Sequence, residues 1–512
     1  MYTAKLWKYW AVFFLSHLYI AESYRIYIGR TSKRCSYGER GSLTATCENI
    51  DTASFFKSTP YRFDHLDETL QCVNCSLKTV EPNTFDISGN QIKHLVLKNS
   101  GIEELQPRGF VGLVFVMDVD LSNNRIKKVN ARTFSGIKKI ESINLRNNSL
   151  ESLLNEGFGE LTNLVTLTLS ENKISEMEHY AFQGLKSLKV LKLNNNLIRN
   201  VTYVFNNLTT LEHLDLSNNR ISAITKIEFS NLTSLLELKL DKNKIKYLPS
   251  LVFYGAPQLE LLGLSFNLLE GYDPEAFEGL NNLETLDLGS NLLTDIQEKS
   301  MTSLQGLLNL NLTGNGFTIF QVKRFAGLPI LRVLDLSSNQ IEDIDVSGIF
   351  PLHDLHTLDL SKNKLDDFDY VSLLHRMPRI TYLYLQGNNW RCDLEDEMEK
   401  YFDGESFKFQ LFDKKNGSVV CNDSIQKKNH SFHAALPIRS DTSLSADKSD
   451  STQLMIIFGL VFLAFAVILL SYGQYQISKE IRFNPLMTRK RTVSEVKLFQ
   501  SEIRDDDSDF PK

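Results

Sequence analysis

The stretch of sequence that decides the fold is LDLSNNRI, residues 214–221. Three near copies stand elsewhere: VDLSNNRI begins at residue 119, LDLGSNLL at residue 286 and LDLSSNQI at residue 334. Every copy has leucine at its third position and asparagine at its sixth. The alternation of apolar and polar residues before the asparagine predicts a short strand with one buried face. The repetition indicates one structural unit that is used many times along the chain.

The third residue of this phrase, the key leucine, recurs thirteen times at a nearly constant interval. The interval is 24 residues throughout, except for 23 after Leu193 and 25 before Leu385. The third residue after each key leucine is asparagine in every copy but the first, which has Ser100. The key leucines are Leu97, Leu121, Leu145, Leu169, Leu193, Leu216, Leu240, Leu264, Leu288, Leu312, Leu336, Leu360 and Leu385.

This pattern resembles the leucine-rich repeat family and covers residues 92–388. The resemblance implies an α/β solenoid, a horseshoe of about 13 repeats of 24 residues with disulfide-bonded caps. Elementary physics agrees, because one short strand buries too little to be stable, whereas stacked copies share a core. Each buried leucine contributes roughly 1.5–3 kcal/mol. The asparagine amide offers donors and an acceptor to backbone groups where the strand turns away.

A second ladder, of phenylalanine, lies thirteen residues after the key leucines and is expected to stack behind the sheet. Its members are Phe110, Phe134, Phe158, Phe182, Phe229, Phe253, Phe277 and Phe325, with Phe205 one position early. Glycine two residues later predicts a tight turn with positive φ. These glycines are Gly112, Gly136, Gly184, Gly255, Gly279 and Gly327. Asn207 and Asn231 take the same position, and asparagine tolerates positive φ better than most residues.

Residues 1–23 predict a cleaved signal peptide. Lys5 and Lys8 precede an apolar run, and Ala21 and Ser23 supply the small side chains that cleavage needs. An uncleaved membrane anchor is the alternative. His17 interrupts the run and leaves it short for a membrane span, which favours cleavage.

Residues 454–472 predict a transmembrane helix, because no polar side chain stands between 454 and 470 and the length matches the bilayer core. Lysine and arginine are frequent in the segment 473–512, whereas Arg439 and Lys448 are the only ones in the 20 residues before the span. Positively charged flanks remain on the cytoplasmic side. The sequence therefore predicts a single-pass type I protein of the plasma membrane, with an extracellular N-terminus and a cytoplasmic tail.

The six cysteines are expected to form disulfides, because exported chains fold in an oxidising compartment. Cys392 and Cys421 follow the repeats and are expected to pair with each other. Three pairings are open for the four that precede the repeats. A zinc site is the alternative for those four, and their irregular spacing disfavours it. They are Cys35, Cys47, Cys72 and Cys75.

The motif N-x-[ST], the acceptor for N-glycosylation, occurs nine times. Asn74 is a weak candidate because it lies between two cysteines. Asn311 should point from the middle of a strand onto the concave face, where a glycan would obstruct a partner. An unoccupied asparagine is the alternative there. The glycosylation candidates are Asn147, Asn200, Asn207, Asn231, Asn311, Asn416, Asn422 and Asn429.

The concave face of the sheet is the predicted binding surface. Side chains three before, one before and one after each key leucine should line it, over a length on the order of 60 Å at about 4.8 Å per strand. The binding candidates are Arg146, Lys192, Asp215, Glu237, Lys239, Asp241, Tyr382 and Tyr384. Tyrosine is enriched among residues that dominate binding. The alternative is structural, since aspartate recurs before the key leucine and a terminal tyrosine can seal the core.

Residues 24–91 and 389–421 are expected to cap the solenoid, with a flexible stalk at 422–453. Trp390 should seal the last repeat. The segments IKHLVLKNSGIEELQPRGF (92–110) and NNWRCDLEDEMEKYF (388–402) resemble insect leucine-rich repeat proteins, in particular the transmembrane type of the mosquito leucine-rich immune group. The family's C-terminal caps usually carry four cysteines, so the two here are a departure. The resemblance implies recognition of pathogen surfaces or of extracellular immune proteins.

Catalytic motifs such as H-E-x-x-H, G-x-S-x-G or a phosphate-binding glycine loop are absent from the sequence, so we expect no enzyme, cofactor or metal. A net charge of -6 gives no broad basic surface for nucleic acid. Two functions remain. One is a receptor or co-receptor of innate immunity that binds an extracellular protein or a pathogen surface. The other is cell adhesion by homophilic or heterophilic contact, and a homo-oligomer is open in both.

Overall fold

The computed structural model describes residues 35–37, 43–57, 67–87, 89–347, 352–401, 408–410 and 421. The predicted signal peptide at 1–23 and the predicted span at 454–472 lie outside these residues, as do the stalk and the tail. Among the helices that are described, none combines the length and the apolar character needed to cross a membrane.

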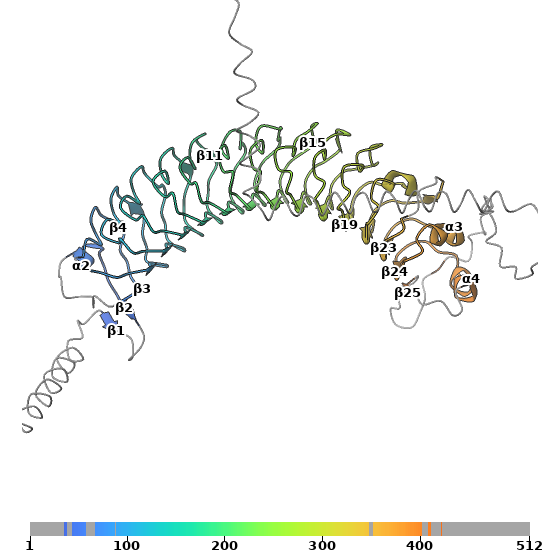
Figure 1. Cartoon of the computed structure of the whole chain (residues 1–512). Helices are drawn as coiled ribbons and strands as arrows, with labels where there is room; N and C mark the ends of the chain where they lie inside the picture. Colours follow the sequence, from blue (N-terminus) through green and yellow to red (C-terminus); the bar gives the residue numbers. More distant parts are fainter. Residues whose placement is uncertain are drawn as a thin grey trace, which may run out of the picture. The chain divides into compact units, whose positions relative to one another are not determined.

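The described chain winds into a curved stack of about 14 turns, with its strands along the inner side (Figure 1). One strand from each turn, together with additional strands at the two ends of the stack, makes up a 17-stranded sheet. Its strands pair in parallel, apart from β1 (Cys35–Tyr37), which pairs with β2 in antiparallel fashion. The parallel strands are β2 (Thr44–Glu48), β3 (Thr69–Val73), β5 (His94–Val96), β7 (Asp118–Asp120), β8 (Ser142–Asn144), β10 (Thr166–Thr168), β12 (Val190–Lys192), β13 (His213–Asp215), β14 (Glu237–Lys239), β16 (Leu261–Gly263), β18 (Thr285–Asp287), β19 (Asn309–Asn311), β21 (Val333–Asp335), β23 (Thr357–Asp359), β24 (Tyr382–Tyr384) and β25 (Lys408–Gln410).

The outer side of the stack carries shorter elements. Two-residue and three-residue strands pair between neighbouring turns: β4 (Thr79–Val80) with β6 (Glu104–Leu105), β9 (Ser152–Leu153) with β11 (Glu176–Met177), β15 (Tyr247–Leu248) with β17 (Gly271–Tyr272), and β20 (Ile319–Gln321) with β22 (Asp343–Asp345). The described helices are α2 (Ser54–Lys57), the 3-10 helix η1 (Val322–Phe325), α3 (Tyr370–His375) and α4 (Leu394–Tyr401).

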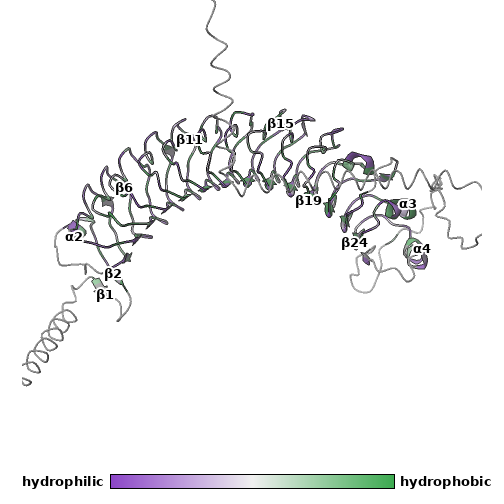
Figure 2. Cartoon of the chain, viewed as in Figure 1, coloured by the Kyte–Doolittle hydropathy of each residue, from purple (hydrophilic) through white to green (hydrophobic). Residues whose placement is uncertain are grey.

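The core lies between the inner strands and the outer elements, as the repeat pattern predicts. In β14 the middle residue Leu238 is buried, Glu237 and Lys239 on either side of it are half-buried, and the key leucine Leu240 is buried. The same alternation recurs from turn to turn, and Figure 2 shows hydrophobic and hydrophilic residues alternating around the stack. The predicted leucine-rich solenoid is confirmed, with about 14 turns where the sequence pattern indicates about 13.

The repeated asparagine bridges neighbouring turns through its amide. The Nδ2 atom of Asn243 donates to the carbonyl oxygens of Leu240 in its own turn and of Leu216 in the preceding turn, at 3.0 Å each. Its Oδ1 atom accepts a hydrogen bond from the backbone nitrogen of Ile221 at 3.0 Å. This arrangement repeats along the sheet and confirms the predicted role, because a buried amide here satisfies groups that the strands leave unpaired.

The phenylalanine ladder also forms, and it extends beyond the repeats that the sequence defines. Neighbouring rings stack at centroid distances of 5.1–6.5 Å, for example Phe110 with Phe134 and Phe253 with Phe277. Phe56 and Phe85 continue the ladder toward the N-terminus. The strands β2 and β3 likewise pair in register with β5. The sheet thus begins before residue 92, inside the segment expected to be only a cap.

The glycine prediction is partly wrong. Positive φ occurs as expected at four glycines and at Asn207, but not at Gly255, Gly327 or Asn231. At Gly255 the reason for glycine is close approach, since an added β-carbon would lie 2.3 Å from the carbonyl oxygen of Phe229 in the preceding turn. The four with positive φ are Gly112, Gly136, Gly184 and Gly279.

Disulfides close both ends of the stack. Cys392 bonds to Cys421 as expected. Of the three pairings open for the other four cysteines, the structure contains Cys35–Cys47 and Cys72–Cys75. Trp390 is buried against Phe368, and its indole nitrogen donates to the Leu385 carbonyl at 2.7 Å. This tryptophan therefore covers the last repeat, as the sequence predicts.

Candidate binding surface

The concave face is built by two residues from each strand. Because side chains alternate across a strand, the residues on either side of the buried middle one point away from the core. The strands are in register, so that equivalent residues stand opposite each other, as His213 does to Glu237 and Asp215 to Lys239. The sheet therefore presents two columns of side chains side by side along the stack.

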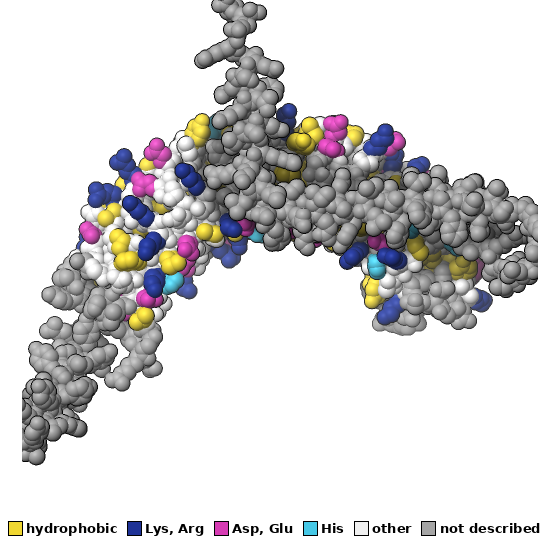
Figure 3. Space-filling view, in the orientation of Figure 1, with side chains coloured by type: hydrophobic (Ala, Val, Ile, Leu, Met, Phe, Trp, Pro, Cys, Tyr) yellow, Lys and Arg dark blue, Asp and Glu magenta, His cyan; other side chains and the backbone are white. Residues whose placement is uncertain are grey.

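The first half of this face carries both signs of charge, as predicted. His94 Nδ1 lies 2.7 Å from Asp118 Oδ2, and Arg146 Nη2 lies 2.6 Å from Glu171 Oε1. Lys192 is exposed and has no ion-pair partner among the described residues. Figure 3, which looks onto the flank of the stack, shows basic and acidic groups interspersed on its visible part. A partner could replace water around Lys192 without breaking an internal contact.

The centre of the face holds a network of charged groups. Glu237 accepts from His213 at 2.9 Å and pairs with Lys239 at 2.5 Å. Burial acts to raise the pKa of the Glu237 carboxyl, but the hydrogen bonds from Lys239 and His213 lower it on balance. The hydrogen bond to Glu237 raises the pKa of Lys239, and the charges of Asp215 and Asp241 add to this effect. The predicted binding candidates of β13 and β14 thus lie together and neutralise one another.

The aspartates before the key leucines serve the fold. Asp215 Oδ1 accepts a hydrogen bond from the backbone nitrogen of Ser217, two residues later in the chain, at 2.9 Å. Asp335 and Asp359 each accept an equivalent bond, at 2.8 Å, from the backbone nitrogen of the serine two residues later. Asp241 follows its key leucine, Leu240, and its Oδ1 atom accepts from the backbone nitrogen and the hydroxyl of Ser265 in the next turn. Each carboxylate thereby satisfies a backbone group where its strand ends. This recurrence favours the structural interpretation of Asp215.

Two of these carboxylates have unusual acidity. Burial raises the pKa of the Asp287 carboxyl, and the nearby charge of Asp241 adds to the shift. Burial likewise raises the pKa of Asp359, with a further contribution from Asp335. The later strands therefore hold carboxylates that are costly to charge, which is a property of packing and not of a reaction centre.

The tyrosines at the end of the row face outward. The rings of Tyr382 and Tyr384 stack with centroids 6.4 Å apart, and 40% of Tyr382 is exposed. Lys408 Nζ lies 5.9 Å from the centroid of the Tyr382 ring. The core beneath them is sealed by Leu383 and by Trp390 instead. Tyr382 is consequently available to a partner on the concave face, whereas Tyr384 is half-buried beside it.

The described glycosylation candidates differ in their surroundings. Asn147, Asn200, Asn207 and Asn231 are exposed. Asn311 is half-buried on the concave face, where its Nδ2 atom donates to Asp287 at 2.9 Å and its Oδ1 atom accepts from the backbone of Thr313. Asn416, Asn422 and Asn429 lie outside the described residues.

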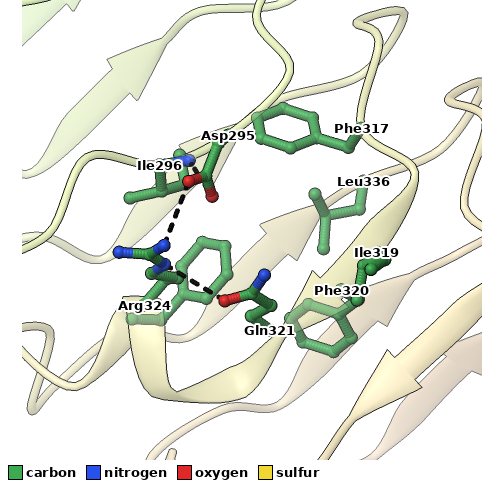
Figure 4. A pocket seen from close by; sticks show the side chains of 9 residues that line it. Asp295, Ile296, Phe317, Ile319, Phe320, Gln321, Arg324 and Leu336 are labelled. Atoms are coloured by element: carbon green, nitrogen blue, oxygen red, sulfur yellow. Dashed lines mark hydrogen bonds and ion pairs between the residues drawn. The ribbon is translucent and has the colours of Figure 1, made fainter.

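Figure 4 shows a small pocket that is lined by residues of neighbouring turns. Arg324 lies at its mouth and bonds to Asp295 at 3.1 Å and to Gln321 at 3.2 Å. Buried side chains such as Phe320 form its floor. In the part of the chain that the structure describes, no three His, Cys, Asp or Glu side chains gather to hold a metal ion.

Sequence reasoning missed an exposed apolar surface on the flank of the stack. Phe266 and Leu268 follow β16, and Leu292 follows β18. Their exposed fractions are 57%, 39% and 52%, respectively. Phe266 has a φ of 53°, at a position where most other turns place a polar residue. The signal was present in the sequence as apolar residues outside the repeat pattern.

The comparisons with known proteins agree with this architecture. The leucine-rich repeat pattern matches residues 116–174, 162–221, 202–245, 235–293, 257–317, 284–341, 306–365 and 329–389. The chain belongs to the leucine-rich repeat family. Comparison with curated proteins gives no match.

Several solved structures share the fold of this leucine-rich repeat chain. A chain of the Toll–Spatzle complex from Drosophila has 22% identity and a TM-score of 0.58, over 71% of this chain and 50% of that chain. The mosquito LRIM1/APL1C complex has 18% identity and a TM-score of 0.51, over 90% and 82%. The APL1 leucine-rich repeat domain has 18% identity and a TM-score of 0.50, over 71% and 92%. At these identities the likeness shows the fold alone.

Proposed function

We propose that this protein is a single-pass receptor or co-receptor of the cell surface whose concave sheet binds an extracellular protein or a pathogen surface in innate immune recognition. The observation that carries the proposal is the concave face itself. Lys192 and Tyr382 are exposed there, and the half-buried Tyr384 stacks beside Tyr382. Scaffolds of this kind typically bind other proteins on such extended surfaces.

The immune assignment is supported by the solved structures with similar folds. They include the Toll–Spatzle complex, described as a hub in development and innate immunity, and the LRIM1/APL1C complex. Both are assemblies of proteins. A protein ligand is accordingly favoured over a small molecule.

The cell-surface assignment is supported by the sequence at both ends. The apolar segments 1–23 and 454–472 fit a signal peptide and a membrane span, and the disulfides suit an oxidising compartment. With an epitope tag after residue 24 and another at the C-terminus, antibodies on intact cells should detect the first tag only. Staining of the C-terminal tag without permeabilisation would overturn this topology.

Binding by the concave face is testable on cells that display the full-length chain. The probes are a panel of purified extracellular proteins and heat-killed bacteria and fungi, each fluorescently labelled. We expect at least one probe to bind, and Lys192→Glu and Tyr382→Ala each to weaken it by roughly tenfold, as residues central to an interface do. Lys173→Glu is the matched control, because Lys173 is exposed but lies off the concave face.

Two outcomes would count against this proposal. The first is that no probe in the panel binds the displayed chain. The second is binding that both concave variants leave unchanged. Adhesion is the alternative function. Homophilic adhesion would be favoured instead if non-adherent cells that express the chain aggregate with one another and exclude control cells from the aggregates.

A further inference from the structure

The flank of the stack that follows the inner strands carries a cluster of basic side chains. In each turn the second, fourth and sixth residues after the key leucine lead around this flank. In the three turns that begin at Leu193, Leu216 and Leu240, five of these nine positions hold lysine or arginine, and none holds aspartate or glutamate. The basic cluster comprises Arg199, Arg220, Lys242, Lys244 and Lys246, all of which are exposed.

Backbone hydrogen bonds hold the members of the basic cluster side by side. The backbone nitrogen of Arg220 donates to the carbonyl oxygen of Ile198, the residue before Arg199, at 2.8 Å. The backbone nitrogen of Lys244 donates in the same way to Ile221, the residue after Arg220, at 2.8 Å. Because neighbouring turns lie about 4.8 Å apart, the five cations are gathered over only about 10 Å along the stack.

The charges of the basic cluster are not used within the fold. In the part of the chain that the structure describes, none of the five side chains forms an ion pair or a side-chain hydrogen bond. Asp241 precedes Lys242 in the chain, but its carboxylate accepts hydrogen bonds from Ser265 instead. Like charges held together in this way create a positive potential that attracts anions.

The basic cluster is confined to one flank and to three turns. The opposite flank of the same turns consists of the four residues before each of β13, β14 and β16, and these hold two glutamates and no lysine or arginine. The turn before the cluster carries both signs, with Glu171 and Lys173 at the second and fourth positions. In the turn after it, Glu270 takes the sixth position beside Lys246 and ends the cluster.

We propose that the basic cluster binds a linear sulfated polysaccharide. Five unpaired cations gathered over about 10 Å match a partner of high charge density. A sulfated chain has this density, whereas a polysaccharide with carboxylates alone has fewer charges along its length. Arginine and lysine donate charge-assisted hydrogen bonds to such oxyanions. The concave face remains open, since a different part of each turn builds the cluster, so this site is additional to the proposed function.

The surroundings of the basic cluster favour a narrow chain over a flat bilayer. Asn200 directly follows Arg199 and is exposed, and Asn147 is exposed at the second position two turns before the cluster. Both are glycosylation candidates, and glycans at these positions would hold a membrane away from the flank. A single polysaccharide chain that crosses the three turns needs only the width of the cluster.

Heparin is the probe that tests this site. Purified full-length protein in non-ionic detergent should bind immobilised heparin at about 0.15 M NaCl. The affinity should fall steeply with added salt, because binding releases counterions from a polyanion. Arg220→Ala and Lys244→Ala combined should raise the Kd by roughly tenfold or more, and should lower the slope of log Kd against log salt by about two, one for each lost contact.

The matched control removes two lysines outside the basic cluster. Lys226 is exposed in the same turn as Arg220 but lies at the tenth position, and Lys186 is exposed at the seventeenth position of an earlier turn. Lys226→Ala combined with Lys186→Ala should leave the Kd and the salt slope unchanged. Circular dichroism of every variant verifies that the fold is retained, as expected for exposed positions.

Three outcomes would overturn this proposal. The first is that heparin does not bind, and the second is that the cluster variant and the control variant bind heparin equally well. The third is that desulfated heparin, single-stranded DNA or vesicles of phosphatidylglycerol and phosphatidylcholine bind as tightly as heparin, which would assign the cluster to another class of anion.

Failure of this proposal is distinguishable from failure of the proposed function. Tyr382→Ala on the concave face should leave heparin binding unchanged, and the cluster variant should leave binding of the protein probes unchanged. Each variant is therefore measured with both sets of probes. Loss of heparin binding in Tyr382→Ala to the same degree as in the cluster variant would also contradict a separate site on the flank.

Discussion

At the scale of single residues, the asparagine ladder joins the sequence pattern to the stability of the fold. Asn243 spans two turns with one side chain and satisfies backbone groups in both. Asn243→Leu has similar bulk but neither donor nor acceptor, and it should lower the free energy of unfolding by at least about 1–3 kcal/mol. Thermal unfolding followed by circular dichroism measures this loss. An unchanged melting midpoint would contradict the stabilising role of the asparagine amide.

The second prediction concerns the Asp359 carboxyl and the dependence of folding stability on pH. A raised pKa in the folded state means that folding favours the protonated form, so this stabilisation is lost as pH rises through the folded pKa. Asp359→Asn keeps an acceptor for the Ser361 nitrogen and removes the buried charge. We expect a melting midpoint higher by on the order of 1–2 °C at pH 7.

The gain from Asp359→Asn should shrink toward zero as pH falls below about 3.9, where the unfolded carboxyl is also protonated. Asp215→Asn is the control, because Asp215 lies near the charge of Lys239 and its removal brings no gain. A gain of equal size for both variants, or one independent of pH, would refute the assignment of the effect to buried charge.

Asn311 supports a third prediction at this scale. Its amide nitrogen, the atom that would receive a glycan, donates to Asp287, and the side chain is half-buried between strands. We expect peptides that contain Asn311 to remain unmodified in protein secreted from animal cells, while those with the exposed Asn231 are glycosylated. Mass spectrometry after enzymatic deglycosylation in heavy-oxygen water reports both, and full occupancy of Asn311 would contradict the expectation.

At the scale of elements, the C-terminal cap depends on a buried cation. Arg391, with 2% of its side chain exposed, contacts Asp367 at 3.4 Å, Asp393 at 2.6 Å and Glu397 of α4 at 2.5 Å. Arg391→Met keeps the bulk but leaves the buried Asp367 without this charge partner, at an expected cost of about 3–5 kcal/mol. Adding Asp367→Asn should recover part of the loss in thermal unfolding. A double variant less stable than the single one would refute the pairing.

The elements also show what the sequence can predict. The period of 24 residues places every inner strand from β5 to β24, because burial of one face and the asparagine bridge both recur with it. The strands β2 and β3 escaped prediction, since their turns lack the asparagine and hold cysteines instead. Gly255 was misassigned because a close backbone approach and a positive φ both require glycine, and the sequence does not distinguish them.

The candidate site was harder to predict than the fold. The repeat period alone identifies which residues line the concave face. It does not show which of their side chains are held in contacts within the fold. Asp215 and Lys192 occupy equivalent positions in adjacent strands, yet one caps a backbone nitrogen and the other has no ion-pair partner among the described residues. The flank patch was overlooked because its residues lie where the repeat pattern imposes no choice.

At the scale of the whole molecule, the stack behaves as a one-dimensional array in which each turn contacts only its neighbours. Deletion of residues 265–288 removes one complete period, including β18, and brings β16 beside β19, with Leu264 followed by a turn that retains Asn291. The sheet, the asparagine bridge and the phenylalanine ladder all stay in register. Deletion of residues 265–276 removes half a period and places buried positions toward solvent.

We therefore expect the 24-residue deletion to fold with a cooperative thermal transition near that of the parent, and the 12-residue deletion to be misfolded or strongly destabilised. Circular dichroism and limited proteolysis compare the two. Equal disruption by both deletions would show that the turns are not interchangeable units.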